Sequence, residues 1–250
     1  MLPILQIGPL ALQVPGLFII IGIWLGLSLS EHLATRFHSN ASTLYNLTFI
    51  SLIAGLIGAR LSFAAQHSAA FVDAPLNIFS LNPGLLDPVG GVAIGLLTAL
   101  VFGNRQKLHL FHTLDALTPM LAVTMIGFHL ANFASGKAFG TQTSLPWGIH
   151  LWGLDRHPVQ IYDSILSILI LGWLWYHTRE KANPALGLPG GIFWGFLSIS
   201  ATARLFTEAF RGDSVLVVNN LRIAQILAWI LLALSLYMQL RLEKAHAPQG

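Results

Sequence analysis

The sequence predicts an all-α membrane protein, built as a bundle of seven transmembrane helices. Of its 250 residues 54% are hydrophobic and only 9% are charged, whereas soluble domains carry about 25% charged residues. This composition excludes a disordered chain and a coiled coil, and 13 Lys and Arg against 10 Asp and Glu are too few for a nucleic-acid-binding stripe. Because the chain has no cysteine, any reacting thiol must come from a partner.

Seven apolar stretches approach the roughly 20 residues that a helix needs to cross a membrane. They cover residues 14–31, 46–66, 88–104, 114–135, 160–177, 188–209 and 220–241. The third is short and opens with a proline and two glycines, so a tilted or re-entrant segment also fits there. Residues 1–13 contain no basic residue and are expected on the membrane surface rather than as a signal peptide. Since neither an internal repeat nor a low-complexity linker is found, residues 1–250 are expected to form one integral-membrane domain.

The Lys and Arg residues orient the bundle. One set lies in short loops and in the tail, as residues that fix topology do: Arg36, Arg105, Lys107, Arg179, Lys181, Arg241 and Lys244. The set at the opposite helix ends comprises Arg60, Lys137, Arg156, Arg204, Arg211 and Arg222. We therefore expect the N-terminus outside and the C-terminus in the cytoplasm. Arg60 and Arg204 lie inside apolar stretches, where an arginine costs about 3 kcal/mol unless it faces water, a partner or a ligand. An anionic group near the outer leaflet would supply that partner.

The run ARLFTEAFRGD, residues 203–213, carries the strongest candidate site. On a helix Arg204 and Glu208 are four residues apart and share a face, which Arg211 continues at the next turn. One interpretation is an intramembrane ion pair that locks the helix. The other is an arginine held by Glu208 so that its guanidinium can bind a phosphate through two hydrogen bonds.

Two further runs lie at the same membrane face. In DRHPVQIYD, residues 155–163, the polar residues either cap the fifth helix and anchor it at the interface, or His157 and Tyr162 reach a lipid headgroup. In GFHLANFASGKAFG, residues 127–140, His129 and Asn132 are three apart on one helix face. A lone intramembrane histidine is more often a hydrogen-bonded core residue than a catalyst, but Asn132 beside it favours a polar cavity.

A fourth run, GLLDPVGGVAIG at residues 84–95, places Asp87 at a helix N-cap, and its glycines favour close packing. The ten histidines are scattered and include no pair four residues apart, so no metal site and no cofactor are expected. Together the four runs indicate a site for a phospholipid headgroup at one membrane face.

Taken in order, these segments resemble the bacterial prolipoprotein diacylglyceryl transferase family over essentially the whole chain. IGARLSF is similar to the family's Gly-Ala-Arg-Leu segment, RHPVQIYDS to its His-Pro-Ser-Gln-Leu-Tyr-Glu, and RLFTEAFRGD to its Arg-x-x-x-Glu-x-x-Arg-x-x-Asp. Residues retained from the family pattern are Arg60, Asn132, Gly140, His157, Gln160, Tyr162, Arg204, Glu208, Arg211 and Gln225. This chain departs from the family pattern at five positions. The family has a tyrosine where this chain has Pro15, a histidine at Val89, an arginine at His129, a glutamate at Lys137 and a tyrosine at Ser200.

The resemblance implies transfer of a diacylglyceryl group from phosphatidylglycerol to the lipobox cysteine thiol of a prolipoprotein signal peptide. Glycerol phosphate is released, and the reaction takes place at the outer leaflet of the bacterial inner membrane. His129, Arg204 and Glu208 are then the expected catalytic residues, with His129 as the base that replaces the missing family histidine. The expected substrate-binding residues are Arg60, Asn132, Gly140, His157, Gln160, Tyr162 and Arg211. Two alternatives remain, a related transferase with another lipid donor or acceptor and a non-catalytic phospholipid-binding relative.

Overall fold

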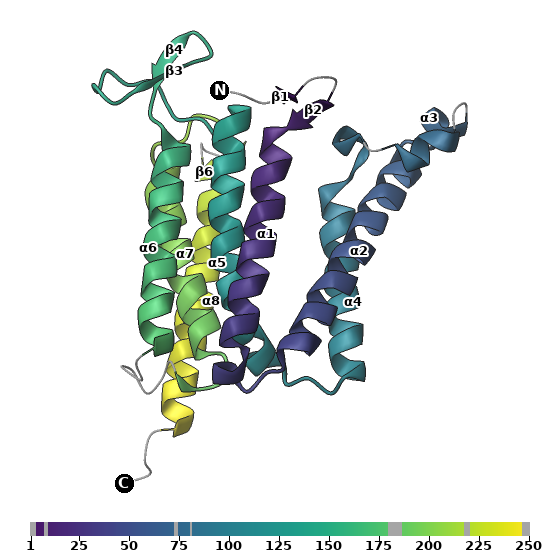
Figure 1. Cartoon of the computed structure of the whole chain (residues 1–250). Coiled ribbons are helices and arrows are strands. Elements are labelled where there is room, and N and C mark those ends of the chain that lie inside the picture. Colours follow the sequence, from purple (N-terminus) through teal and green to yellow (C-terminus); the bar gives the residue numbers. More distant parts are fainter. Residues whose placement is uncertain are drawn as a thin grey trace.

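The computed structural model describes residues 4–7, 10–72, 75–80, 82–179, 187–217 and 221–246. Its long helices run side by side and alternate in direction (Figure 1). They are α1 (Val14–Leu33), α2 (Ala41–Gln66), α4 (Pro88–Arg105), α5 (Leu110–Ser135), α6 (Val159–Arg179), α7 (Gly191–Glu208) and α8 (Ile223–His246). The expected helical bundle is confirmed, and each of the seven apolar stretches overlaps one of these helices.

Six of the helices in the described ranges are long and apolar enough to cross a membrane, and α7 is not among them. Its 18 residues include Arg204 and Glu208, which lower its mean hydropathy. The third stretch, α4, is one unbroken helix. Its N-cap is Asp87, as expected, and the hydroxyl of Ser62 together with the amides of Gly90 and Val89 holds the pKa of that carboxyl below its ordinary value.

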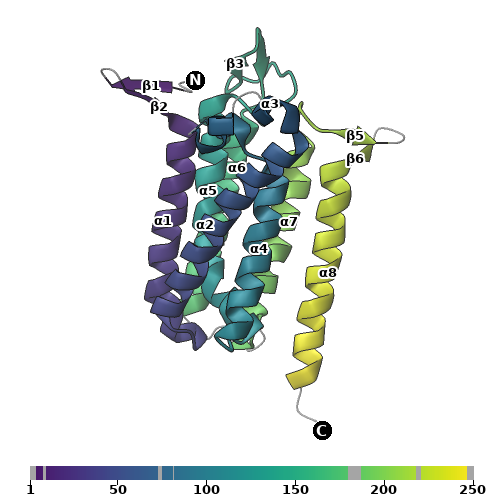
Figure 2. The same cartoon turned by 90° about the vertical axis from the view of Figure 1, so that its right-hand side faces the viewer.

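Short elements lie between the helices. At one end of the bundle are three antiparallel hairpins: β1 (Ile4–Ile7) with β2 (Leu10–Gln13), β3 (Ile149–Leu151) with β4 (Leu154–Arg156), and β5 (Leu216–Val217) with β6 (Leu221–Arg222). All three are visible at the top of Figure 2. The short helix α3 (Ser68–Val72) and the 3-10 turns Pro75–Phe79 and Pro83–Leu85 lie at the same end, whereas the 3-10 turn Ala34–Phe37 follows α1 at the other.

Helix α5 is central, because α1, α6 and α7 all pack against it. Small residues let the backbones approach closely: a Cβ on Gly127 of α5 would lie 2.5 Å from the carbonyl oxygen of Phe18 in α1. Such close packing of small residues is a main source of helix association in a membrane. Helices α2 and α4 pack on each other as a second pair beside this bundle (Figure 1).

Buried polar groups fix the position of α7 relative to its neighbours. The carboxylate of Asp115 in α5 accepts hydrogen bonds from the backbone amides of Gly190 (2.6 Å) and Phe193 (2.8 Å), at the N-terminus of α7. These amides have no partner within their own helix, so Asp115 acts as a cap supplied by another helix. Gln239 of α8 donates to the hydroxyl of Ser198 and the carbonyl of Trp194 in α7. These contacts hold the N-terminal half of α7 against α5 and α8.

Candidate active site

The candidate site lies about two turns or less inside the helix ends that carry the hairpins. His129 precedes the last residue of α5 by six positions, Asp163 follows the first residue of α6 by four, and Arg204 precedes the last residue of α7 by four. At about 1.5 Å of rise per residue these side chains start at similar depths. Three helices therefore bring ionisable groups to one level of the bundle.

The strongest contact is the ion pair between Arg204 and Glu208. The Arg204 Nη2 atom lies 2.9 Å from the Glu208 Oε2 atom, as expected for residues four apart on a helix. Glu208 is fully buried, and its Oε1 atom accepts a hydrogen bond from the hydroxyl of Ser214. Its backbone carbonyl accepts one from Arg222. The Arg204 side chain remains 34% exposed, so one edge of its guanidinium is fixed while the rest is available to a ligand.

Arg211 is enclosed by carboxylates. It donates through Nε and Nη2 to both oxygens of Asp213, at 3.0 and 3.1 Å. Its Nη1 atom lies 3.6 Å from Asp163 Oδ2, and its Nε atom lies 3.9 Å from Glu208 Oε2. Bidentate pairing of this kind fixes the orientation of a guanidinium. Of the two arginines in the run, Arg204 is thus the one placed to meet a substrate.

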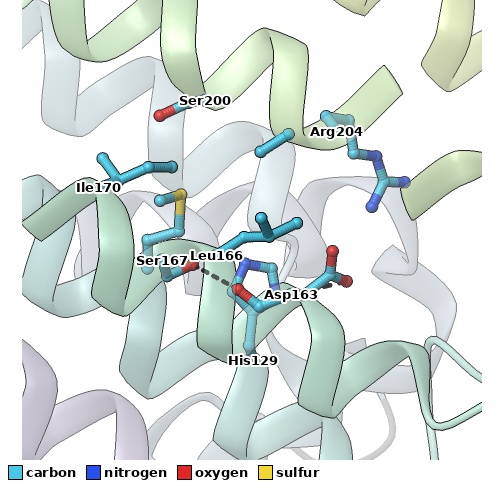
Figure 3. Close-up of a pocket in the computed structure, with 9 residues that line it drawn as sticks. His129, Asp163, Leu166, Ser167, Ile170, Ser200 and Arg204 are labelled. Carbon is cyan, nitrogen blue, oxygen red and sulfur yellow. Dashed lines mark hydrogen bonds and ion pairs between the residues drawn. The ribbon is translucent and has the colours of Figure 1, made fainter. Parts of the chain in front are cut away.

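His129 and Asp163 face each other. The Nδ1 atom of His129 lies 3.7 Å from Asp163 Oδ2, and the two side chains are 14% and 5% exposed. Neither atom has a hydrogen-bond partner among the residues that the structure describes. They line a cavity of about 130 Å³ between α5, α6 and α7, together with the polar side chains of Ser167, Ser200 and Arg204. Figure 3 shows Arg204 directed toward the side of this cavity where Asp163 and His129 lie. The cavity has room for a small polar group in an otherwise apolar bundle.

Gly140 lies where three chain segments meet. Its backbone pairs with that of Arg211, and a Cβ at Gly140 would lie only 2.3 Å from the carbonyl oxygen of His157. The neighbouring Thr141 donates to the carbonyl of Phe210 at 2.8 Å and accepts from the amide of His157 at 3.0 Å. Glycine is therefore needed here to bring the ends of α5, α6 and α7 together.

The α6 residues of the second run lie around the same junction. Gln160 is buried and donates to the carbonyl of Lys137 at 2.8 Å, which links α6 to the turn after α5. The Tyr162 hydroxyl accepts from the Trp147 indole at 2.9 Å and lies 3.4 Å from His157 Nδ1. Asn132 lies on α5 three residues beyond His129, and its side chain is half-buried. These residues form the edge of the site toward the hairpins.

Arg60 lies apart from the other expected site residues. Its guanidinium donates to the backbone carbonyls of Ile78 (2.9 Å), Asn82 (3.4 Å) and Leu85 (2.8 Å), in the connection between α2 and α4. These contacts explain its burial within an apolar helix without a ligand, because backbone carbonyls satisfy its donors. Arg60 fixes that connection above the α2–α4 pair.

Sequence reasoning missed Asp163 as a site residue. It closes the run DRHPVQIYD, and the signal that could have found it was a carboxylate one turn inside an apolar helix. Asp213 and Arg222, which hold Arg211 and Glu208, were also missed as partners. Both lie in or beside the β5–β6 region, whose fold the sequence did not predict.

Long apolar helices around a buried ionic site define the class: a multi-pass helical membrane protein with ionisable groups buried near one end of the bundle. Within that class, the chain belongs to the prolipoprotein diacylglyceryl transferase family, since the model of that family matches residues 3–241. The family resemblance inferred from the motifs is confirmed.

Three relatives illustrate how far the similarity extends, and each is named phosphatidylglycerol–prolipoprotein diacylglyceryl transferase. The protein from Synechococcus elongatus is 28% identical over 242 residues, covering 92% of this chain and 83% of the relative. The protein from a Nostoc species is 27% identical, covering 93% and 86%. The protein from Bordetella parapertussis is 31% identical over 188 residues, covering 71% and 72%. The match therefore includes most of each chain.

Proposed function

We propose that this protein transfers the diacylglyceryl group of phosphatidylglycerol to the lipobox cysteine thiol of prolipoproteins, with release of glycerol phosphate. The family and the names of the relatives support the reaction. The observation that carries the proposal is Arg204, which Glu208 fixes at the edge of a cavity that His129 and Asp163 also line, while the guanidinium stays partly exposed. A cation held in this way suits the phosphate of a lipid headgroup.

We further propose that residues 1–250 form a single domain in the bacterial inner membrane, with the N-terminus outside and the C-terminus in the cytoplasm. Strand β1 and the last turn of α8 lie at opposite ends of the bundle (Figure 1), which requires an odd number of crossings between them. The six apolar helices and α7 together supply seven. Helix α7 can cross although it carries two charges, because Arg204 and Glu208 neutralise each other inside the protein. The site then faces the outer leaflet.

The proposed reaction forms a bond between the thiol sulfur and the glycerol carbon that carries the phosphate. The carbon–oxygen bond to the phosphate breaks, and its electron pair leaves on the phosphate oxygen. Arg204 binds that phosphate and stabilises its growing negative charge, while Glu208 keeps the guanidinium in place. The thiol, with an ordinary pKa of about 8.5, gives its proton to His129, a neutral imidazole at the wall of the cavity.

The remaining residues have supporting roles in this proposal. Asn132, His157 and Tyr162 contact the headgroup at the hairpin side of the cavity, where His157 and Tyr162 lie together. Gln160 and Gly140 hold the surrounding segments, and Arg211, paired with Asp213, links the segment after α7 to Asp163. Arg60 acts indirectly, by fixing the connection between α2 and α4.

The reaction can be tested in vesicles that contain the purified protein, labelled phosphatidylglycerol and a peptide with a lipobox cysteine. Mass spectrometry should find the peptide heavier by one diacylglyceryl group and an equal amount of glycerol phosphate. A peptide with serine in place of the cysteine is the control for the acceptor. Arg204→Ala should abolish product formation. Arg241→Lys should not change it, because Arg241 lies near the C-terminal end of α8, at the end of the bundle away from the candidate site.

Two other outcomes of this assay would contradict the proposed reaction, and each would favour a different function. Product formed from a lipid with another headgroup, but not from phosphatidylglycerol, would indicate a transferase with a different donor. Bound phosphatidylglycerol without product after long incubation would indicate a non-catalytic lipid-binding relative.

A further inference from the structure

Asp163 is a buried carboxylate that lies between a histidine and an arginine. Its Oδ2 atom is 3.7 Å from Nδ1 of His129 and 3.6 Å from Nη1 of Arg211. The carboxylate reaches the level of the cavity from α6, whereas His129 reaches it from α5. Asp163 therefore connects the proposed base to the segment that follows α7.

Arg211 alone does not account for this carboxylate. Arg211 already forms a bidentate ion pair with Asp213 and lies near Glu208. Burying another carboxylate against a guanidinium that is already neutralised gains little and costs desolvation. The group that otherwise lacks a partner is His129 Nδ1, which has no hydrogen bond to any described residue. The geometry thus gives Asp163 a partner in His129.

We propose that Asp163 is a positioning residue that holds His129 with its proton on Nδ1, so that the lone pair of Nε2 accepts the proton of the substrate thiol. At 3.7 Å the two groups are within ion-pair distance but are not hydrogen-bonded. An ionised carboxylate can only accept a hydrogen bond, so when the two close to hydrogen-bond distance the ring nitrogen that faces it is the donor. In a neutral imidazole the other nitrogen is then the acceptor. The use of this lone pair for thiol chemistry rests on the proposed function, whereas the tautomer itself does not.

The proton balance of this step is simple. The thiol proton moves to Nε2, which makes His129 an imidazolium with both nitrogens protonated. Asp163 stabilises that cation across 3.7 Å, and it opposes the repulsion from Arg204, which lines the same cavity, and from Arg211. The imidazolium then returns the proton to the released glycerol phosphate or to water. Asp163 does not take up the proton in this step, as the carboxylate does not in a serine-protease triad.

A double-mutant cycle on the transfer rate tests the coupling. Asp163→Asn keeps the size of the side chain, and we expect it to lower kcat about 10²- to 10⁴-fold with KM nearly unchanged, since proton transfer is what it impairs. His129→Gln should cost a similar factor, and adding Asp163→Asn to it should cost little more. Asp163→Glu should restore part of the rate. Losses that multiply in the double variant would show that Asp163 is only structural.

A second measurement does not depend on activity. Nitrogen-15 NMR of labelled histidine at pH about 8, above the ordinary histidine pKa of about 6.5, distinguishes the two neutral tautomers, and the His129 signal is the one lost in His129→Gln. We expect the Nδ1-protonated form in the wild-type protein and a shift toward the Nε2-protonated form in Asp163→Asn. The matched control is Asp155→Asn, because Asp155 pairs with His150 at 3.1 Å on the exposed β3–β4 hairpin.

The two measurements separate the proposals. An Nε2-protonated His129 in the wild-type protein would overturn the positioning role, whatever the protein catalyses. The expected tautomer in a protein that releases no glycerol phosphate would count against the proposed function and leave the positioning role standing.

Discussion

The replacement of Arg204 by lysine tests how the phosphate is held. A lysine at this position keeps a positive charge on the same helix face, four residues from the fully buried Glu208. Glu208 is therefore not left as an unpaired buried charge, which would cost about 3–5 kcal/mol of stability. However, an ammonium group paired with Glu208 cannot offer two parallel N–H groups to a phosphate. Losing one charge-assisted hydrogen bond costs about 1.5–3 kcal/mol, which corresponds to a rate about 10- to 150-fold lower.

The assay is the initial rate of glycerol phosphate release from phosphatidylglycerol vesicles, with thermal unfolding measured on the same preparations. Arg241→Lys is the matched control, because Arg241 donates to the hydroxyl of Tyr237 on its own helix and lies five residues before the end of α8, at the end of the bundle away from the hairpins. Arg204→Lys should unfold at nearly the wild-type temperature. A wild-type rate for this variant would refute the reasoning and would make the Arg204–Glu208 pair a purely structural contact.

Three further substitutions probe the framework of the site. Gly140→Ala should lower both the transfer rate and the unfolding temperature, because its Cβ would lie 2.3 Å from the His157 carbonyl oxygen; an unchanged rate would mean that the junction can relax. Asp115→Ala removes the acceptor of two backbone hydrogen bonds at the start of α7, and it should destabilise the protein by about 1–3 kcal/mol in unfolding from detergent micelles. Gln239→Leu should cost about 0.6–2 kcal/mol because it removes the bond to Ser198, and its transfer rate should equal that of the wild type. A slower rate in this last variant would show that α8 packing controls the site.

The helices were predictable in number and approximate place because hydrophobicity along the chain reports burial in lipid or protein. The residues at which the helices begin and end were less predictable. Helix α2 begins at Ala41, five residues before the expected 46, because Asn40 caps it by accepting from the amide of Thr43. The first turns of α2 are rich in polar residues, which a hydropathy average excludes although they are helical. The hairpins were not predicted, since strands of two to four residues are too short to show an alternating pattern.

By itself the sequence determined the membrane class, the family and the contact between Arg204 and Glu208. These depend on composition, on ordered motifs and on the fixed geometry of residues four apart in one helix. Only the tertiary structure decided that His129 faces Asp163, that carboxylates enclose Arg211, and that Arg60 binds backbone carbonyls of a connection. The physical reason is that such contacts depend on the rotation of each helix about its own axis and on which faces pack together. Small residues at the helix interfaces and buried caps such as Asp115 set that rotation. The hydrophobic pattern along the sequence does not predict it.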